Sequence, residues 1–268
     1  MSESDQQVRT FNGLRRIVAT LRAPGGCPWD RVQTHETLRH YLTEEASETL
    51  SALDEGDPAK LKEELGDLLL QILMHTQIAE DEREFRMGDV IESVADKLVR
   101  RHPHVFGAAV AETPDAVVEQ WDDLKRKERN GGSALTGIPA ALPALAQAQT
   151  IQRRAGKAGF QWETEEQAWV ALDEELGELR QAATPEERRR EAGDALFALA
   201  NLVRFVDVDA EEALRSTCGG FSRLFRAVEG LAGERELDLS QSDLDTKLKL
   251  WEEAKARGQA RQIEGGRP

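Results

Sequence analysis

Two pairs of acidic residues in the first half of the chain have a spacing that suits metal binding. Glu45 and Glu48 are three positions apart, as are Glu64 and Asp67. On a helix, each pair projects from one face, one turn apart. If the two helices pack side by side, the four carboxylates meet and repel one another unless cations lie among them. An all-oxygen ligand set suits Mg²⁺, with Mn²⁺ as a substitute, rather than zinc.

The same acidic pattern occurs again about 130 residues further along the chain. Glu-Glu-x-x-Glu and Glu-x-Gly-Asp recur in the same order, preceded by a Trp with a following acid and followed by Trp-x-x-x-Lys. Such a period is too long for a solenoid repeat and indicates a duplicated domain. The candidate metal ligands are Glu45, Glu48, Glu64 and Asp67 in the first copy and Glu175, Glu178, Glu191 and Asp194 in the second.

Glycine and proline are dense between the two copies, from residue 130 to residue 143. This composition marks a linker rather than the interior of an element. The sequence therefore predicts two domains, 1–134 and 135–268.

Other interpretations of the acidic motifs need to be weighed. A single Glu-Glu-x-x-Glu is most often a solvated helix face. Here the motif recurs beside apolar residues, and both Glu-x-Gly-Asp helices carry a glycine that costs roughly 1 kcal/mol relative to alanine. We therefore expect close backbone approach at Gly66 and Gly193. A di-iron bundle requires Glu-x-x-His, and none of the five histidines lies three residues after a Glu.

The elements that position these acids are predicted to be helices. Apolar residues recur at spacings of three and four between Leu38 and Leu53. Asp57-Pro58 and Thr184-Pro185 are signals for a helix start, and a further helix is expected at about residues 88–101. Aromatic residues make up only 5% of the chain. These features together predict an all-α fold of two tandem helical-bundle repeats.

Charge and cysteine content narrow the class of protein. The net charge is −15, which argues against a nucleic-acid partner or a membrane surface, because both require basic patches. Cys27 and Cys218 form no disulfide framework, and no stretch has the length of a membrane span. We expect a cytoplasmic protein.

Two further segments complete a family resemblance. Residues 26–30 read GCPWD, and residues 96–106 read DKLVRRHPHVF. Together with the acidic motifs, they resemble the MazG family over nearly the whole chain, including the duplication found in its long members. The resemblance implies an all-α enzyme, usually a homodimer, that hydrolyses nucleoside triphosphates with broad base specificity to the monophosphate and pyrophosphate.

The resemblance also implies roles for individual residues. The acids would hold Mg²⁺, Glu44 would be an accessory catalytic acid, and Lys97 and Arg101 would act on the phosphates. The implied substrate-binding residues are Lys97, Arg100, Arg101, Trp121, Lys125, Trp251 and Lys255. An ordinary basic helix end is the alternative for the cations of residues 97–101. For the tryptophans the alternative is the hydrophobic core, which we expect for Trp29.

The second copy departs from the family pattern at its basic segment. Gly220 and Leu224 stand where the family has lysine and arginine. Loss of two phosphate donors weakens transition-state stabilisation. Our hypothesis is that the first copy keeps the more complete site and the second binds metal or nucleotide with little turnover. A metal-dependent nucleotide-binding regulator and a helical interaction protein are the alternative functions.

Overall fold

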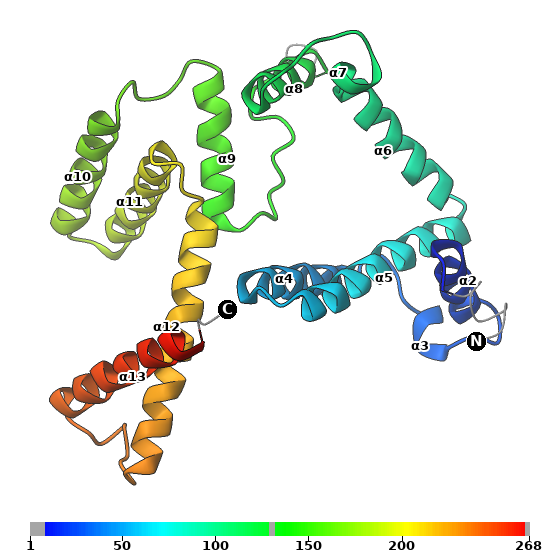
Figure 1. The fold of residues 1–268 in the computed structure, drawn as a ribbon. Coiled ribbons are helices and arrows are strands. Elements are labelled where there is room, and N and C mark those ends of the chain that lie inside the picture. Colours follow the sequence, from blue (N-terminus) through cyan, green and yellow to red (C-terminus); the bar gives the residue numbers. More distant parts are fainter. Residues whose placement is uncertain (1–8, 129–131, 266–268) are drawn as a thin grey trace. The chain divides into compact units, whose positions relative to one another are not determined.

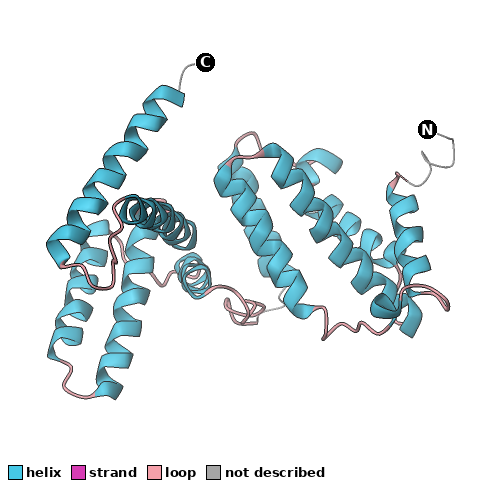
Figure 2. Cartoon of the chain, turned by 90° about the horizontal axis from the view of Figure 1, so that it is seen from below, coloured by secondary structure: helices cyan, strands magenta, loops and turns pink. Residues whose placement is uncertain are grey.

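The computed structural model describes residues 9–128 and 132–265, and over these ranges it contains helices joined by loops and no strand (Figures 1 and 2). This confirms the predicted all-α fold. The chain divides into two compact units, Met1–Glu128 and Arg129–Pro268, whereas the sequence placed the boundary near residue 134. Within the described ranges, no helix combines the length and apolarity needed to cross a membrane.

The first unit is built around a long helical hairpin. Its helices are α2 (Phe11–Arg22), α3 (Pro28–Arg31), α4 (Arg39–Glu55), α5 (Pro58–Glu82), α6 (Met87–Arg101), α7 (Pro103–Phe106) and α8 (Pro114–Glu128). Gly56 ends α4 with φ of 66°, a left-handed conformation that glycine adopts without strain. Asp57 then caps α5 by accepting hydrogen bonds from the backbone N–H groups of Ala59 and Lys60. The chain therefore reverses within two residues, and α4 packs antiparallel to α5.

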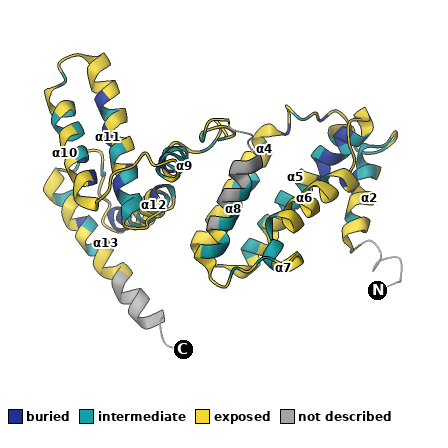
Figure 3. Cartoon of the chain, turned by 90° about the horizontal axis from the view of Figure 1, so that it is seen from above, coloured by how far each residue is buried: buried dark blue, intermediate teal, exposed yellow. Residues whose placement is uncertain are grey.

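The core of the first unit lies at one end of this hairpin. Val18 of α2, Leu38, and Leu73 and Ile78 of α5 are almost fully buried together. These residues anchor the second half of α5 and the start of α4. Figure 3 shows the contrast with α6, where residues 91–100 are all exposed.

The second unit repeats the hairpin with different neighbours. Its helices are α9 (Ala144–Lys157), α10 (Glu165–Gln181), α11 (Pro185–Phe205), α12 (Ala210–Glu234) and α13 (Leu244–Gly265). Thr184 and Glu187 form a capping box at the start of α11, with Pro185 at the first helical position. The pair α10 and α11 is therefore the counterpart of α4 and α5.

Truncation of Leu38 tests the position of the first core. Leu38→Ala removes a fully buried side chain and should lower the free energy of unfolding by about 2–5 kcal/mol. Leu53→Ala, on the same hairpin but at a position 54% exposed, should change it by about 0.5 kcal/mol. Urea denaturation followed by circular dichroism measures both, and equal effects would contradict this account of the core.

Candidate metal centre

Carboxylates of α4 and α5 meet in the first unit as the sequence predicts for a metal site. Glu45, Glu48 and Glu64 each offer an oxygen atom, and these atoms lie within 4.8 Å of one another. Asp67, the fourth predicted ligand, is close enough that its charge raises the pKa of Glu45. The hairpin brings them together because α4 and α5 run side by side away from the core end.

The first acidic cluster is electrostatically unfavourable without a cation. Desolvation is the main cause of the raised pKa of Glu45, followed by the charges of Asp67 and Glu48. The pKa of Glu64 is also raised, by desolvation and then by Glu48. Oxygen ligands that repel one another at this range suit a hard divalent cation such as Mg²⁺.

A buried glutamine that the sequence reasoning missed supports the first cluster. Gln71 is buried on α5, and its Nε2 donates a hydrogen bond to Glu45 Oε1 at 3.5 Å. Gln71 lies one turn after Asp67, so helical spacing was the signal that could have identified it. This hydrogen bond restricts the orientation of the Glu45 carboxylate.

The second unit holds the matching acids in a different environment. Glu175, Glu191 and Asp194 form a group of the same size, and burial followed by the charges of Asp194 and Glu178 raises the pKa of Glu175. Glu191 is buried and accepts a hydrogen bond from Arg190 Nε at 3.1 Å. This ion pair offsets part of the negative charge of the second cluster. In the first cluster, the charge of Lys60 opposes the rise in the pKa of Glu64.

The predicted phosphate donors lie on a separate helix. Lys97, Arg100 and Arg101 belong to α6, which packs on α5 and α7 and leads away from the α4/α5 hairpin (Figure 1). Asp67 and the end of α5 are roughly 22 Å apart along the helix, so α6 begins far from the acids. Glu44 lies on the exposed side of α4 in a shallow groove with Arg39, His40 and Ser47.

The tryptophan and lysine candidates have different environments in the two units. In the first, Trp121 is half-buried and contacts the His102 ring edge-to-face at 5.0 Å, while the side chain of Lys125 lies outside the described residues. In the second, Trp251 packs on the α12/α13 core, and Lys255 Nζ lies 5.9 Å from its ring centroid.

Two local expectations were wrong. Trp29 is 51% exposed and makes an edge contact with Tyr41, so it is not a core residue. A Cβ atom added to Gly66 or Gly193 would meet nothing within 4 Å, so neither glycine marks a close backbone approach. In each hairpin the glycine leaves open space beside the acids instead.

The basic segment that is altered in the second copy lies on α12. Leu224 is half-buried and packs on the core cluster around Val228 and Leu250, and Gly220 lies one turn before it. The side chain at position 224 therefore contributes to packing between α12 and α13.

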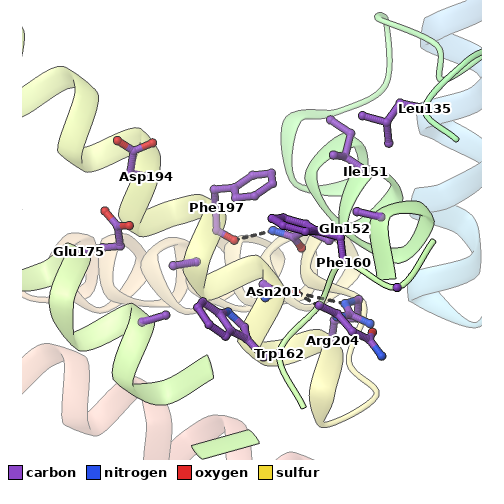
Figure 4. A pocket seen from close by; sticks show the side chains of 15 residues that line it. Leu135, Ile151, Gln152, Phe160, Trp162, Glu175, Asp194, Phe197, Asn201 and Arg204 are labelled. Carbon is purple, nitrogen blue, oxygen red and sulfur yellow. Dashed lines mark hydrogen bonds between the residues drawn. The ribbon is translucent and has the colours of Figure 1, made fainter. Parts of the chain in front are cut away.

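A pocket that the sequence did not predict adjoins the second acidic cluster. It has a volume of about 560 Å³, and Glu175 and Asp194 lie in its wall (Figure 4). Phe160, Trp162 and Phe197 give most of the wall an apolar character. Its residues come from four separate segments of the chain, so no sequence spacing predicts it.

A third group of possible metal ligands lies at the far end of α5. His35, Glu82 and Glu84 have ligand atoms within 4.8 Å of one another. The His35 ring stacks on His75, with their Nδ1 atoms 2.8 Å apart. Desolvation and then the charge of His35 lower the pKa of His75, so burial favours the neutral form of the His75 ring. His102 and His104 contact Trp121 and Gln120 instead.

Comparison with known proteins gives consistent similarities. A family model described as the MazG nucleotide pyrophosphohydrolase domain matches residues 33–106. The chain is 42% identical over 247 residues to the nucleoside triphosphate pyrophosphohydrolase/pyrophosphatase MazG of Thermotoga maritima, covering 91% of this chain and 95% of that one. It is 40% identical over 251 residues to the nucleoside triphosphate pyrophosphohydrolase of Escherichia coli, covering 90% and 95%. A Mycobacterium tuberculosis protein with that same name is 42% identical over 142 residues, covering 52% and 43%.

The raised pKa values predict how stability depends on pH and metal. The pKa of Glu45 is higher in the folded protein than its value of 4.5 in the unfolded chain. Such a carboxyl stabilises the fold at pH values below 4.5, where it is protonated. This stabilisation is lost as the pH rises through the folded-state pKa. Glu45→Gln should therefore reduce the loss of thermal stability of the metal-free protein between pH 5 and pH 8. It should also reduce the rise in Tm on adding Mg²⁺.

The control for this prediction is Glu92→Gln, which removes the same charge from exposed α6. Scanning calorimetry at both pH values, with Mg²⁺ and with EDTA, makes the comparison. Equal behaviour of the two variants would show that Glu45 belongs to no metal centre.

Proposed function

The chain belongs to the MazG family of nucleotide pyrophosphohydrolases, and on this premise we propose that its acidic clusters hold Mg²⁺ for that reaction. The resemblance inferred from the sequence is confirmed by the comparisons. The protein hydrolyses nucleoside triphosphates to nucleoside monophosphate and pyrophosphate. The observation that carries the metal proposal is the mutual approach of Glu45, Glu48 and Glu64 to within 4.8 Å.

The residues fit the ion on chemical grounds. Each cluster supplies carboxylate oxygens alone, which Mg²⁺ prefers, with Mn²⁺ as a possible substitute. When bound, the metal would neutralise the triphosphate and activate water for attack. Gln71 orients Glu45, and Glu44 on the outer face of α4 is proposed as an accessory acid. Lys97 and Arg101 are proposed to donate hydrogen bonds to the phosphates.

We propose that turnover is concentrated in the first unit. Its cluster has no counterpart of the Arg190–Glu191 ion pair among the described residues, and its α6 carries Lys97, Arg100 and Arg101. The second unit has Gly220 and Leu224 in place of the family's basic residues, and Leu224 is committed to packing. The alternative function is a regulator that binds metal and nucleotide without turnover. It suits the second unit, not the chain as a whole. Trp121, Lys125, Trp251 and Lys255 remain proposed substrate contacts.

A homodimer is the proposed assembly. Ile91, Val94 and Leu98 recur along one face of α6 and are exposed in the single chain. An apolar helix stripe left in solvent is unfavourable, and a second copy of the chain can cover it. A dimer would also give α6 a new neighbour, and with it a means of bringing Lys97 and Arg101 to an acidic cluster.

The cytoplasm is the proposed compartment. Both cysteines are free, and the net charge of −15 disfavours nucleic-acid and anionic-membrane partners.

Product analysis tests the reaction and its assignment to a unit. The purified chain, given ATP, CTP, GTP, UTP and their deoxy forms, should release monophosphate and pyrophosphate with Mg²⁺ and nothing with EDTA. Glu64→Gln should lower kcat by at least about 100-fold, because it removes a metal ligand. Glu191→Gln, the matched change in the second unit, should leave most of the rate.

Release of diphosphate and orthophosphate would place the scission at another bond. Full activity of Glu64→Gln together with an inactive Glu191→Gln would transfer turnover to the second unit. Nucleotide binding without any product would favour the regulator.

Substitution on α6 tests the homodimer. The protein should have twice the 29.8 kDa mass of one chain by light scattering, and Val94→Glu with Leu98→Glu should shift it to a monomer. Two charges cannot be buried in an apolar contact without a large desolvation cost. Glu92→Gln on the same helix is the control, and a wild-type chain that is already monomeric would contradict the proposal.

A further inference from the structure

The pocket in the second unit has the dimensions of a small-molecule site. Its volume of about 560 Å³ lies within the usual range of ligand pockets. Figure 4 shows Glu175 and Asp194 on one side and Gln152 and Phe160 on the other, with Phe197 between them. A molecule filling it would therefore meet carboxylates at one end and mostly apolar groups at the other.

Two buried glutamines on α9 differ in one respect. Gln149 uses both halves of its amide: Nε2 donates to the carbonyls of Ala200 and Val208, and Oε1 accepts from the backbone N–H of Ala210. Gln152, one turn later, uses only its donor half, because Nε2 donates to the carbonyl of Phe197 at 2.7 Å. Gln149 is thus a structural residue, and Gln152 has acceptor capacity to spare.

The orientation of the Gln152 amide is fixed by its partner. The Phe197 carbonyl can only accept, so the nitrogen must face it and the oxygen must face away. Gln152 is only 6% exposed, it lines the pocket, and its Oε1 has no hydrogen-bond partner among the described residues. A buried carbonyl in this state destabilises the fold unless a donor reaches it, and this marks a place for a ligand N–H group.

A second amide in the wall is oriented by an arginine. Arg204 Nε and Nη2 donate to Asn201 Oδ1 at 3.2 and 3.1 Å. The guanidinium occupies the oxygen side of this amide, so its nitrogen side is the one that can meet an acceptor. Trp162 and Phe160 add exposed aromatic faces at the pocket, on which a planar ring can stack.

We propose that this pocket binds the base of a nucleoside triphosphate and that Gln152 Oε1 accepts a hydrogen bond from an N–H group of the base. Glu175 and Asp194 then lie on the side of the metal-bound phosphates. The proposal rests on the proposed function, because it assigns the base end of the same substrate. Adenine, cytosine, guanine and uracil all carry an N–H group on an exposed edge, so one acceptor accommodates several bases.

Binding of matched nucleotide analogues tests the role of Gln152. The full chain carrying Glu64→Gln, which weakens the first unit's metal centre, is titrated calorimetrically in Mg²⁺ with α,β-methylene-ATP. The second probe is the same analogue with purine in place of adenine, which lacks only the 6-amino group. The adenine analogue should bind about three- to tenfold more tightly, the range expected for one hydrogen bond.

The substitution Gln152→Met keeps the length of the side chain and removes the acceptor, so the two analogues should then bind equally. Gln149→Met is the matched control on the same helix: its Tm should fall, but the preference for adenine should persist. Three results would each overturn the proposal. The first is equal binding of the two analogues to the Glu64→Gln chain that keeps Gln152, and the second is no binding of either analogue to it. The third is a preference for the adenine analogue that persists in Gln152→Met. Failure of the wild-type chain to hydrolyse any nucleoside triphosphate would instead overturn the proposed function.

Discussion

Repulsion between carboxylates that a helical hairpin forces together is the constraint on which the rest of the structure depends. In the first unit, Glu45, Glu48 and Glu64 approach within 4.8 Å. Desolvation, followed by the charges of neighbouring carboxylates, raises the pKa values of Glu45 and Glu64. Holding these like charges together is unfavourable, so packing elsewhere must fix the two helices. The core around Leu38, Leu73 and Ile78 fixes the two helices at the other end of the hairpin. The end that carries the acids therefore stays open to solvent.

Duplication has preserved the acids while their surroundings have diverged. In the first unit, a neutral amide from Gln71 contacts the cluster, whereas in the second an arginine pairs with Glu191 beside an apolar pocket. In the first unit, Lys60 pairs with Glu55, and its charge also opposes the rise in the pKa of Glu64. The second unit is better shaped to enclose a base. We propose that the two units, each with the same set of acids, divide turnover and base recognition between them.

Sequence patterns revealed the parts of this protein that depend on local spacing. The hairpins were predicted from acids three residues apart and from the helix starts at Asp57-Pro58 and Thr184-Pro185. The all-α fold was predicted from composition. Parts that depend on contacts between distant segments were not predicted. Gln152 is held in the pocket wall by a hydrogen bond to Phe197 of α11, which is 45 residues later in the sequence. Trp29 is exposed, although its residue type suggested burial. The direction of α6, which separates Lys97 from the acids in a single chain, likewise has no local signature.

Anomalous diffraction from crystals grown with Mn²⁺ measures directly whether each hairpin binds a divalent metal. We expect one manganese peak among Glu45, Glu48, Glu64 and Asp67, and a second one among Glu175, Glu178, Glu191 and Asp194. Glu64→Gln should remove the first peak and leave the second. Crystals saturated with Mn²⁺ that show no peak at either cluster, or peaks only at His35 and Glu82, would contradict this expectation.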